Sequence, residues 1–122
     1  MPLPETARRQ AERLELLQSE ARRIVAELAS DPAVRKVIMF GSAARGQART
    51  TSDLDLIVVM QTDLPFIERF GPVWRRIKPA IAVDLLVYTP QEFEQLVRDR
   101  PFIRSAVREG KILYDADADP AA

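Results

Sequence analysis

Three aspartates stand at spacings that let their carboxylates meet. Asp53 and Asp55 begin an apolar run, and because side chains alternate along a strand, both point to one face while Leu54 and Leu56 point into the core. Asp84 interrupts another apolar run, where a buried charge without a partner would be costly. If the two runs form neighbouring strands, one register sets Asp84 against the other two carboxylates. Three such groups repel one another unless a cation lies among them, and Mg²⁺ prefers oxygen ligands, so we expect them to form a Mg²⁺ site.

A Gly-Ser pair precedes the aspartates and suits phosphate binding. Gly41-Ser42 follows an apolar run and stands shortly before Ser52 and the first two aspartates, and glycine lets a backbone approach phosphate oxygens closely. Each feature alone has a plain structural explanation, namely turn chemistry for the Gly-Ser and Ser-Asp pairs and a salt bridge or edge-strand position for Asp84. Taken together, they favour a metal and phosphate site.

Composition limits the chemistry further. The chain contains no His and no Cys, which removes imidazole and thiolate ligands, disulfides, thiol nucleophiles and the commonest general base. Eighteen basic residues balance eighteen acidic ones, so the net charge is zero and no global field attracts a polyanion such as duplex DNA. Any catalysis must therefore use carboxylates, hydroxyls, Arg or Lys side chains, or a hard metal ion. The net charge predicts no nucleic-acid partner.

Length and hydropathy indicate a single soluble domain. A chain of 122 residues with 47% hydrophobic and 30% charged residues is typical of one compact globular unit. No apolar run reaches the roughly 18 residues of a membrane span, and the first residues, Met1-Pro2-Leu3-Pro4, do not form a signal peptide. With the absence of Cys, these features predict a cytoplasmic protein that does not associate with membranes.

Apolar periodicity predicts the elements that must hold the candidate site. Apolar residues recur at helical spacing from Glu5 to Ala29, which predicts a long amphipathic helix. Short apolar runs predict strands from Val34 to Phe40 and from Leu54 to Met60, and the second is apolar enough to be central in the sheet. A polar loop from Gly41 to Ser52, with one helical turn, joins these strands.

Five further elements are expected in the second half of the chain. They are a weak helix, a strand, two helices and a short strand, at Leu64–Ile77, Ile81–Tyr88, Pro90–Arg98, Pro101–Gly110 and Ile112–Tyr114. Thr89 and Glu92 form a capping box around Pro90, which marks the start of the first of the two helices. Gly71-Pro72 interrupts the weak helix, because Pro is favoured at a helix start. This order of elements predicts an α+β fold with one mixed sheet backed by helices.

The composite motif resembles a known family. The stretch Gly41-Ser42-Ala43-Ala44-Arg45-Gly46, then Ser52-Asp53-Leu54-Asp55-Leu56 and a third Asp, Asp84, is similar to the minimal nucleotidyltransferases of the DNA polymerase beta superfamily. The resemblance covers about Val34 to Tyr114. It implies a polymerase beta-like fold in which residues 1–32 form an added amphipathic helix, residues 33–114 the minimal nucleotidyltransferase domain, and residues 115–122 a loose acidic tail.

The resemblance also implies residue roles. It assigns metal binding and catalysis, with two Mg²⁺ ions, to Asp53, Asp55 and Asp84. It assigns the binding of a nucleoside triphosphate to Gly41 and Ser42, and we add Arg45 and Ser52 as candidate nucleotide-binding residues. In this arrangement the metals activate an acceptor hydroxyl and stabilise the pyrophosphate leaving group, while Asp84 takes the hydroxyl proton. Arg49 has the same chemistry as Arg45, but only Arg45 is retained as a phosphate contact.

A protein partner is implied as well. Minimal domains of this family pair with a helical HEPN-domain ribonuclease toxin and act as its antitoxin, by complex formation and by AMP transfer. The resemblance thus implies Mg²⁺-dependent transfer of AMP from ATP to a hydroxyl of that partner, in a HEPN/MNT toxin–antitoxin pair. Two alternatives stay open: a non-catalytic module that neutralises or scaffolds a helical partner, and a homo-oligomeric transferase acting on a small molecule. Three intact aspartates favour catalysis, since binding alone gives no reason to keep repelling acids.

Overall fold

The computed structural model describes residues 2–118 and has the expected α+β architecture. The helices are α1 (Glu5–Ala29), α2 (Gly41–Ala44), α3 (Phe70–Ile77), α4 (Pro90–Asp99) and α5 (Pro101–Glu109), with a 3-10 turn, η1 (Phe66–Glu68). The strands are β1 (Val34–Phe40), β2 (Leu54–Met60), β3 (Val83–Tyr88) and β4 (Lys111–Asp115). They form one mixed sheet in the order β3-β2-β1-β4, in which β2 and β3 are parallel and the other pairs antiparallel. The predicted central position of β2 is confirmed.

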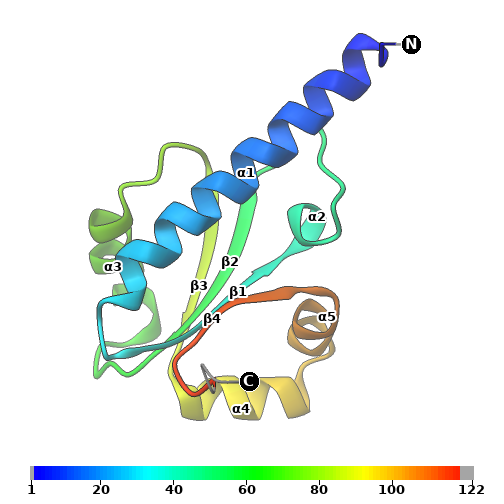
Figure 1. The fold of residues 1–122 in the computed structure, drawn as a ribbon. Helices are drawn as coiled ribbons and strands as arrows, with labels where there is room; N and C mark the ends of the chain where they lie inside the picture. The colour runs from blue at the N-terminus through cyan, green and yellow to red at the C-terminus, as the bar shows by residue number, and fades with distance from the viewer. Residues whose placement is uncertain (1, 119–122) are drawn as a thin grey trace.

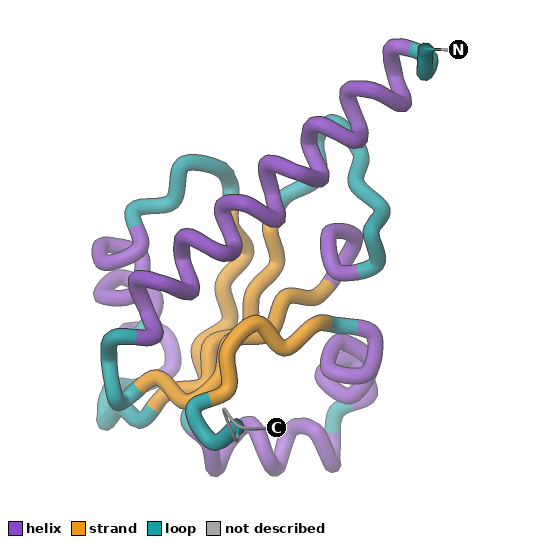
Figure 2. The backbone as a smooth tube through the Cα atoms, viewed as in Figure 1, coloured by secondary structure: helices purple, strands orange, loops and turns teal. Residues whose placement is uncertain are grey.

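Helices cover both faces of the sheet (Figures 1 and 2). On one face, α1 and α3 pack against alternate residues of β2, including Leu54 and Leu56, which are fully buried as predicted. On the other face, α4 and α5 pack over Ile57 and Val59. Because Asp55 lies between Leu54 and Leu56 in the strand, its side chain shares the face of Ile57. The carboxylate of Asp55 therefore lies on the α4/α5 side.

The first helix belongs to the same core as the sheet. Its residues Leu17, Ile24 and Leu28 are buried in the cluster that also contains β2 side chains. The N-terminal half of α1 projects past the sheet (Figure 1). None of the helices in residues 2–118 has the length and apolar content needed to cross a membrane.

Contacts with α1 hold the segment that leads into β3. Arg23 donates to the carbonyls of Ile77 and Lys78 at the end of α3, and its partner Glu20 accepts from the amide of Ala80. The strand begins at Val83, two residues after the expected Ile81, and the segment bonded to α1 leads into it. The sheet edge that carries Asp84 is thus anchored to the first helix.

A buried arginine anchors the other end of β3. Arg69 donates to the carbonyls of Val87 and Leu64 and forms an ion pair with Glu92 at 2.5 Å. Glu92 also accepts from the amide of Thr89, which confirms the predicted capping box. The Arg69 guanidinium therefore joins the segment before η1, the end of β3 and the start of α4.

Two boundaries differ from the sequence expectations. The weak helix expected over Leu64–Ile77 is instead the short turn η1 followed by α3 from Phe70. The expected interruption at Gly71-Pro72 is absent, because both residues lie in the first turn of α3, where amides need no intrahelical acceptor and Pro is tolerated. The last strand extends to Asp115. Beyond it, the amide of Ala116 donates to the carbonyl of Arg35 in β1, and the Arg35 guanidinium pairs with the carboxylate of Asp117. The described part of the predicted loose tail is therefore attached to the sheet, and residues 119–122 lie outside the described residues. The domain bounds 1–32 and 33–114 stay a prediction.

Candidate active site

Two of the three predicted aspartates lie side by side. Strands β2 and β3 are parallel with Asp55 directly opposite Asp84, so both side chains lie on one face of the sheet. Burial raises the pKa of Asp55, and a hydrogen bond with Asp84 and the negative charges of Asp84 and Asp53 raise it further, to about 6, against a weaker opposing effect of Arg45. Asp55 therefore holds a proton more readily than an isolated aspartate does.

Asp84 is exposed, which corrects the expectation that its charge is buried. The reason is strand order: β3 is the edge of the sheet, a position that Asp84 tolerates without a compensating partner. Its predicted register against Asp55 is nevertheless present. The proximity of the two carboxylates, and not the burial of Asp84, is the feature that indicates chemistry.

Asp53 lies immediately before the strand that carries Asp55. It is exposed and precedes β2 at the end of the loop, close enough for its charge to raise the pKa of Asp55. Within residues 2–118, no three acidic side chains are gathered tightly enough to hold a metal ion. The donor set nevertheless suits Mg²⁺, because these are hard oxygen donors whose mutual repulsion a divalent cation relieves, and Mg²⁺ commonly takes its remaining ligands from water and substrate phosphates.

Gly41 fits against the carboxylate pair. Its φ is +74°, a conformation that side-chain-bearing residues rarely adopt, and a Cβ at this position would collide with Oδ2 of Asp55. Phe40, the preceding residue, pairs with Asp55 across β1 and β2. The Gly-Ser turn thus lies directly beside the candidate metal ligand.

The other predicted nucleotide-binding residues meet in one pocket. Ser42, Arg45 and Ser52 line a cavity of about 730 Å³, a volume typical of small-molecule sites. Arg49 lines it too, although the sequence offered no reason to prefer it. The hydroxyl of Ser52 accepts from the amide of Arg49 at 2.8 Å, so this side chain already closes a turn. Arg45 is half-exposed and lies 3.9 Å from Glu109 of α5.

Sequence reasoning missed the contribution of α1. Gln10 and Leu14 form a wall of the same pocket, and Arg13 donates to the carbonyl of Ser52. Helical periodicity indicates which face of α1 is apolar but not which distant loop lies beside it. No local signal in the sequence pairs these residues with the Ser52 loop.

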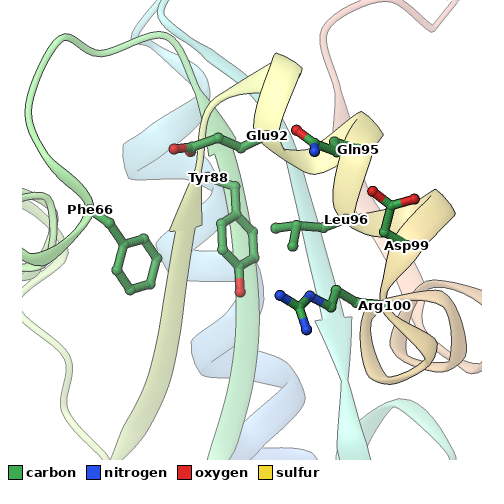
Figure 3. A pocket seen from close by; sticks show the side chains of 7 residues that line it. All are labelled: Phe66, Tyr88, Glu92, Gln95, Leu96, Asp99 and Arg100. Atoms are coloured by element: carbon green, nitrogen blue, oxygen red, sulfur yellow. The ribbon is translucent and has the colours of Figure 1, made fainter.

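A second pocket lies at the far end of β3 from Asp84 (Figure 3). It measures about 370 Å³ and is lined by Phe66 of η1, Tyr88 of β3 and residues of α4 such as Leu96. The ring of Phe66 stacks on that of Tyr88. None of the predicted site residues lines this pocket.

Comparisons with known proteins agree with the geometry. The family model for polymerase beta nucleotidyltransferases matches residues 22–119. A Methanocaldococcus jannaschii protein, provisionally named a protein adenylyltransferase, is 27% identical over 81 residues, 66% of this chain and 79% of that protein. A Sulfolobus solfataricus crystal structure, described as a candidate nucleotidyltransferase, matches with a TM-score of 0.65 and 26% identity, over 95% of this chain and 93% of that chain.

A more distant match shows the fold alone. It is a chain in a toxin–antitoxin crystal structure with AMP-PNP, with a TM-score of 0.50 and 19% identity, over 82% of this chain and 74% of that chain. The match of a family model to most of the chain is the stronger observation. The chain, with its Gly-Ser turn beside paired aspartates, therefore belongs to the polymerase beta nucleotidyltransferase family and is a nucleotidyltransferase.

Proposed function

We propose that this protein transfers AMP from ATP to a hydroxyl group of a partner protein in a Mg²⁺-dependent reaction. The observation that carries the proposal is the carboxylate pair Asp55–Asp84, with Asp53 and Gly41 beside it. The relative named as a protein adenylyltransferase supports a protein acceptor. The partner we propose is a helical HEPN-domain toxin, and the toxin–antitoxin structure with AMP-PNP, which shares the fold, supports a complex of this kind.

The carboxylates would serve the reaction in two ways. The acceptor oxygen bonds to the α-phosphorus of ATP, the bond to the bridging oxygen breaks, and pyrophosphate leaves. Asp84, exposed at the sheet edge, takes the proton of the acceptor hydroxyl. Asp53, Asp55 and Asp84 would hold Mg²⁺, which neutralises charge on the phosphates and activates the hydroxyl.

The pocket of Ser42 would hold the phosphate tail. Arg45 lines this pocket, and its positive charge acts on Asp55. A cation there stabilises the triphosphate and the departing pyrophosphate. Ser42 adds a hydroxyl, and Gly41, which has no side chain, lets the turn lie directly against the Asp55 carboxylate.

A labelling experiment tests the proposal. The protein, its HEPN-domain partner, Mg²⁺ and ATP labelled at the α-phosphate should give labelled partner, and the double variant Asp53→Ala, Asp55→Ala should give none. Asp63→Ala, which removes an exposed aspartate from the loop after β2, is the matched control and should label normally. Undiminished labelling by the double variant would refute the metal assignment. A stable complex that never carries label would instead favour the non-catalytic binding module.

A further inference from the structure

The N-terminal half of α1 lies beside the loop that leads into β2 (Figure 1). The contact is specific: Nε of Arg13 donates to the backbone carbonyl of Ser52 at 2.9 Å, at a partly buried position. Ser52 is the residue immediately before Asp53. A helix that the family motif does not include is therefore bonded to the backbone next to a candidate metal ligand.

The loop itself has few other attachments. Ser52 and Arg49 close a turn through two bonds, from the Ser52 amide to the Arg49 carbonyl at 3.0 Å and from the Arg49 amide to the Ser52 hydroxyl at 2.8 Å. Within the described part of the chain, Arg13 supplies the one hydrogen bond that joins residues 48–53 to another element. Side chains of Gln10 and Leu14 line the cavity between α1 and this loop.

We propose that Arg13 is a positioning residue of the active site. Its bond to the Ser52 carbonyl fixes the turn immediately before Asp53, and so fixes where the backbone of Asp53 enters β2 beside Asp55. A loop without this bond is free to carry Asp53 away from the site. The proposal rests on the proposed function, because Asp53 matters here as a ligand of Mg²⁺. Groups that orient metal ligands commonly contribute 10- to 100-fold to metal affinity or activity.

The first test is amide hydrogen exchange on the metal-free protein, which requires no activity. In Arg13→Ala, the amides of Arg49 and Ser52 should exchange faster than in the unmodified protein, while amides of the sheet keep their rates. Arg9→Ala is the matched control, because Arg9 lies one turn earlier on α1 and its only ion pair within residues 2–118 is an exposed one with Glu5. This control should leave exchange in the loop unchanged.

The second test is the Mg²⁺ dependence of the labelling reaction. Arg13→Ala should raise the half-saturating Mg²⁺ concentration about tenfold, with little change in the rate at saturating Mg²⁺. Arg13→Lys, which keeps a donor, should recover most of this loss, and Arg9→Ala should show none.

Three results separate the possible roles. Unchanged loop exchange and unchanged Mg²⁺ dependence in Arg13→Ala would overturn the proposal. Faster exchange throughout the chain, with a lower Tm, would overturn it too, because Arg13 would then stabilise the fold as a whole. If the unmodified protein transfers no label at any Mg²⁺ concentration, the proposed function fails, and loop exchange alone decides the role of Arg13.

Discussion

Replacing Asp84 by Asn should make the metal-free protein melt at a higher temperature. The folded pKa of Asp55 is about 6, against an ordinary value of 3.8. A group whose pKa is raised on folding stabilises the folded state at low pH and loses this contribution as the pH rises through the folded pKa. The unmodified protein therefore loses stability between about pH 4 and pH 6. Asp84→Asn removes one of the charges responsible at nearly constant volume.

The size of the gain can be bounded. The full change in the pKa of Asp55, from 3.8 to about 6, corresponds to at most about 3 kcal/mol at neutral pH. Burial, its largest cause, remains in the variant, and solvent screening weakens the charge interaction with an exposed Asp84. We therefore expect a gain of about 1 kcal/mol, or an increase in Tm of about 3–5 °C.

Thermal melts in EDTA at pH 4 and pH 7.5 test this reasoning. The Tm difference should be near zero at the lower pH and reach its full size at the higher one. Mg²⁺ and ATP at 100 times the Kd stabilise the unmodified protein by about 2.7 kcal/mol, so adding them should reverse the order if Asp84→Asn binds them poorly. A variant that melts several degrees lower in EDTA, by the same amount at both pH values and with or without ligand, would show that Asp84 is structural.

Two further predictions concern the Gly-Ser turn and the anchor of β3. Gly41→Ala should destabilise the protein by about 1–3 kcal/mol, because the added methyl group meets the Asp55 carboxylate at a position with positive φ. Ser42→Ala should instead leave the Tm unchanged and weaken ATP binding. Thermal melts and calorimetric ATP titrations measure the two effects, and a Gly41→Ala variant with the Tm of the unmodified protein would contradict the predicted collision. Glu92→Gln should lower the free energy of unfolding, measured by urea denaturation, by about 2 kcal/mol, because Arg69 then keeps a buried charge without its anionic partner. A decrease in this free energy of less than about 0.5 kcal/mol would show that the ion pair behaves as an exposed one.

Local patterns in the sequence predicted the elements closely. The strands from Val34 to Phe40 and from Leu54 to Met60 match their predicted bounds, as does the first helix. Apolar runs and helical periodicity indicate which residues are buried, and turn residues indicate where the chain bends. Both signals are local, so they can be interpreted without knowing which segments pack together. The capping box that begins at Thr89 is of the same kind, since all its bonds lie within four residues.

The active-site motif was also recognisable from the sequence, but its geometry was not. Spacing along the chain predicted that Asp53 and Asp55 share a face, because side chains alternate along a strand, but β2 begins at Leu54 and Asp53 lies just before it. The meeting of Asp55 with Asp84 requires two strands to pair in parallel in one particular register. The sequence allowed this register without selecting it.

Only the tertiary structure decided which parts of the candidate site are exposed and what supports them. The strand order makes β3 an edge and so leaves Asp84 in solvent, contrary to the expectation drawn from its apolar neighbours. The bond from Arg13 to Ser52 joins residues 39 positions apart. The exposure of Asp84 and the Arg13–Ser52 bond were unpredictable for the same physical reason. A sequence pattern indicates which side chains of a segment face the core and which face solvent, whereas register, strand order and long-range bonds depend on how separate segments pack together.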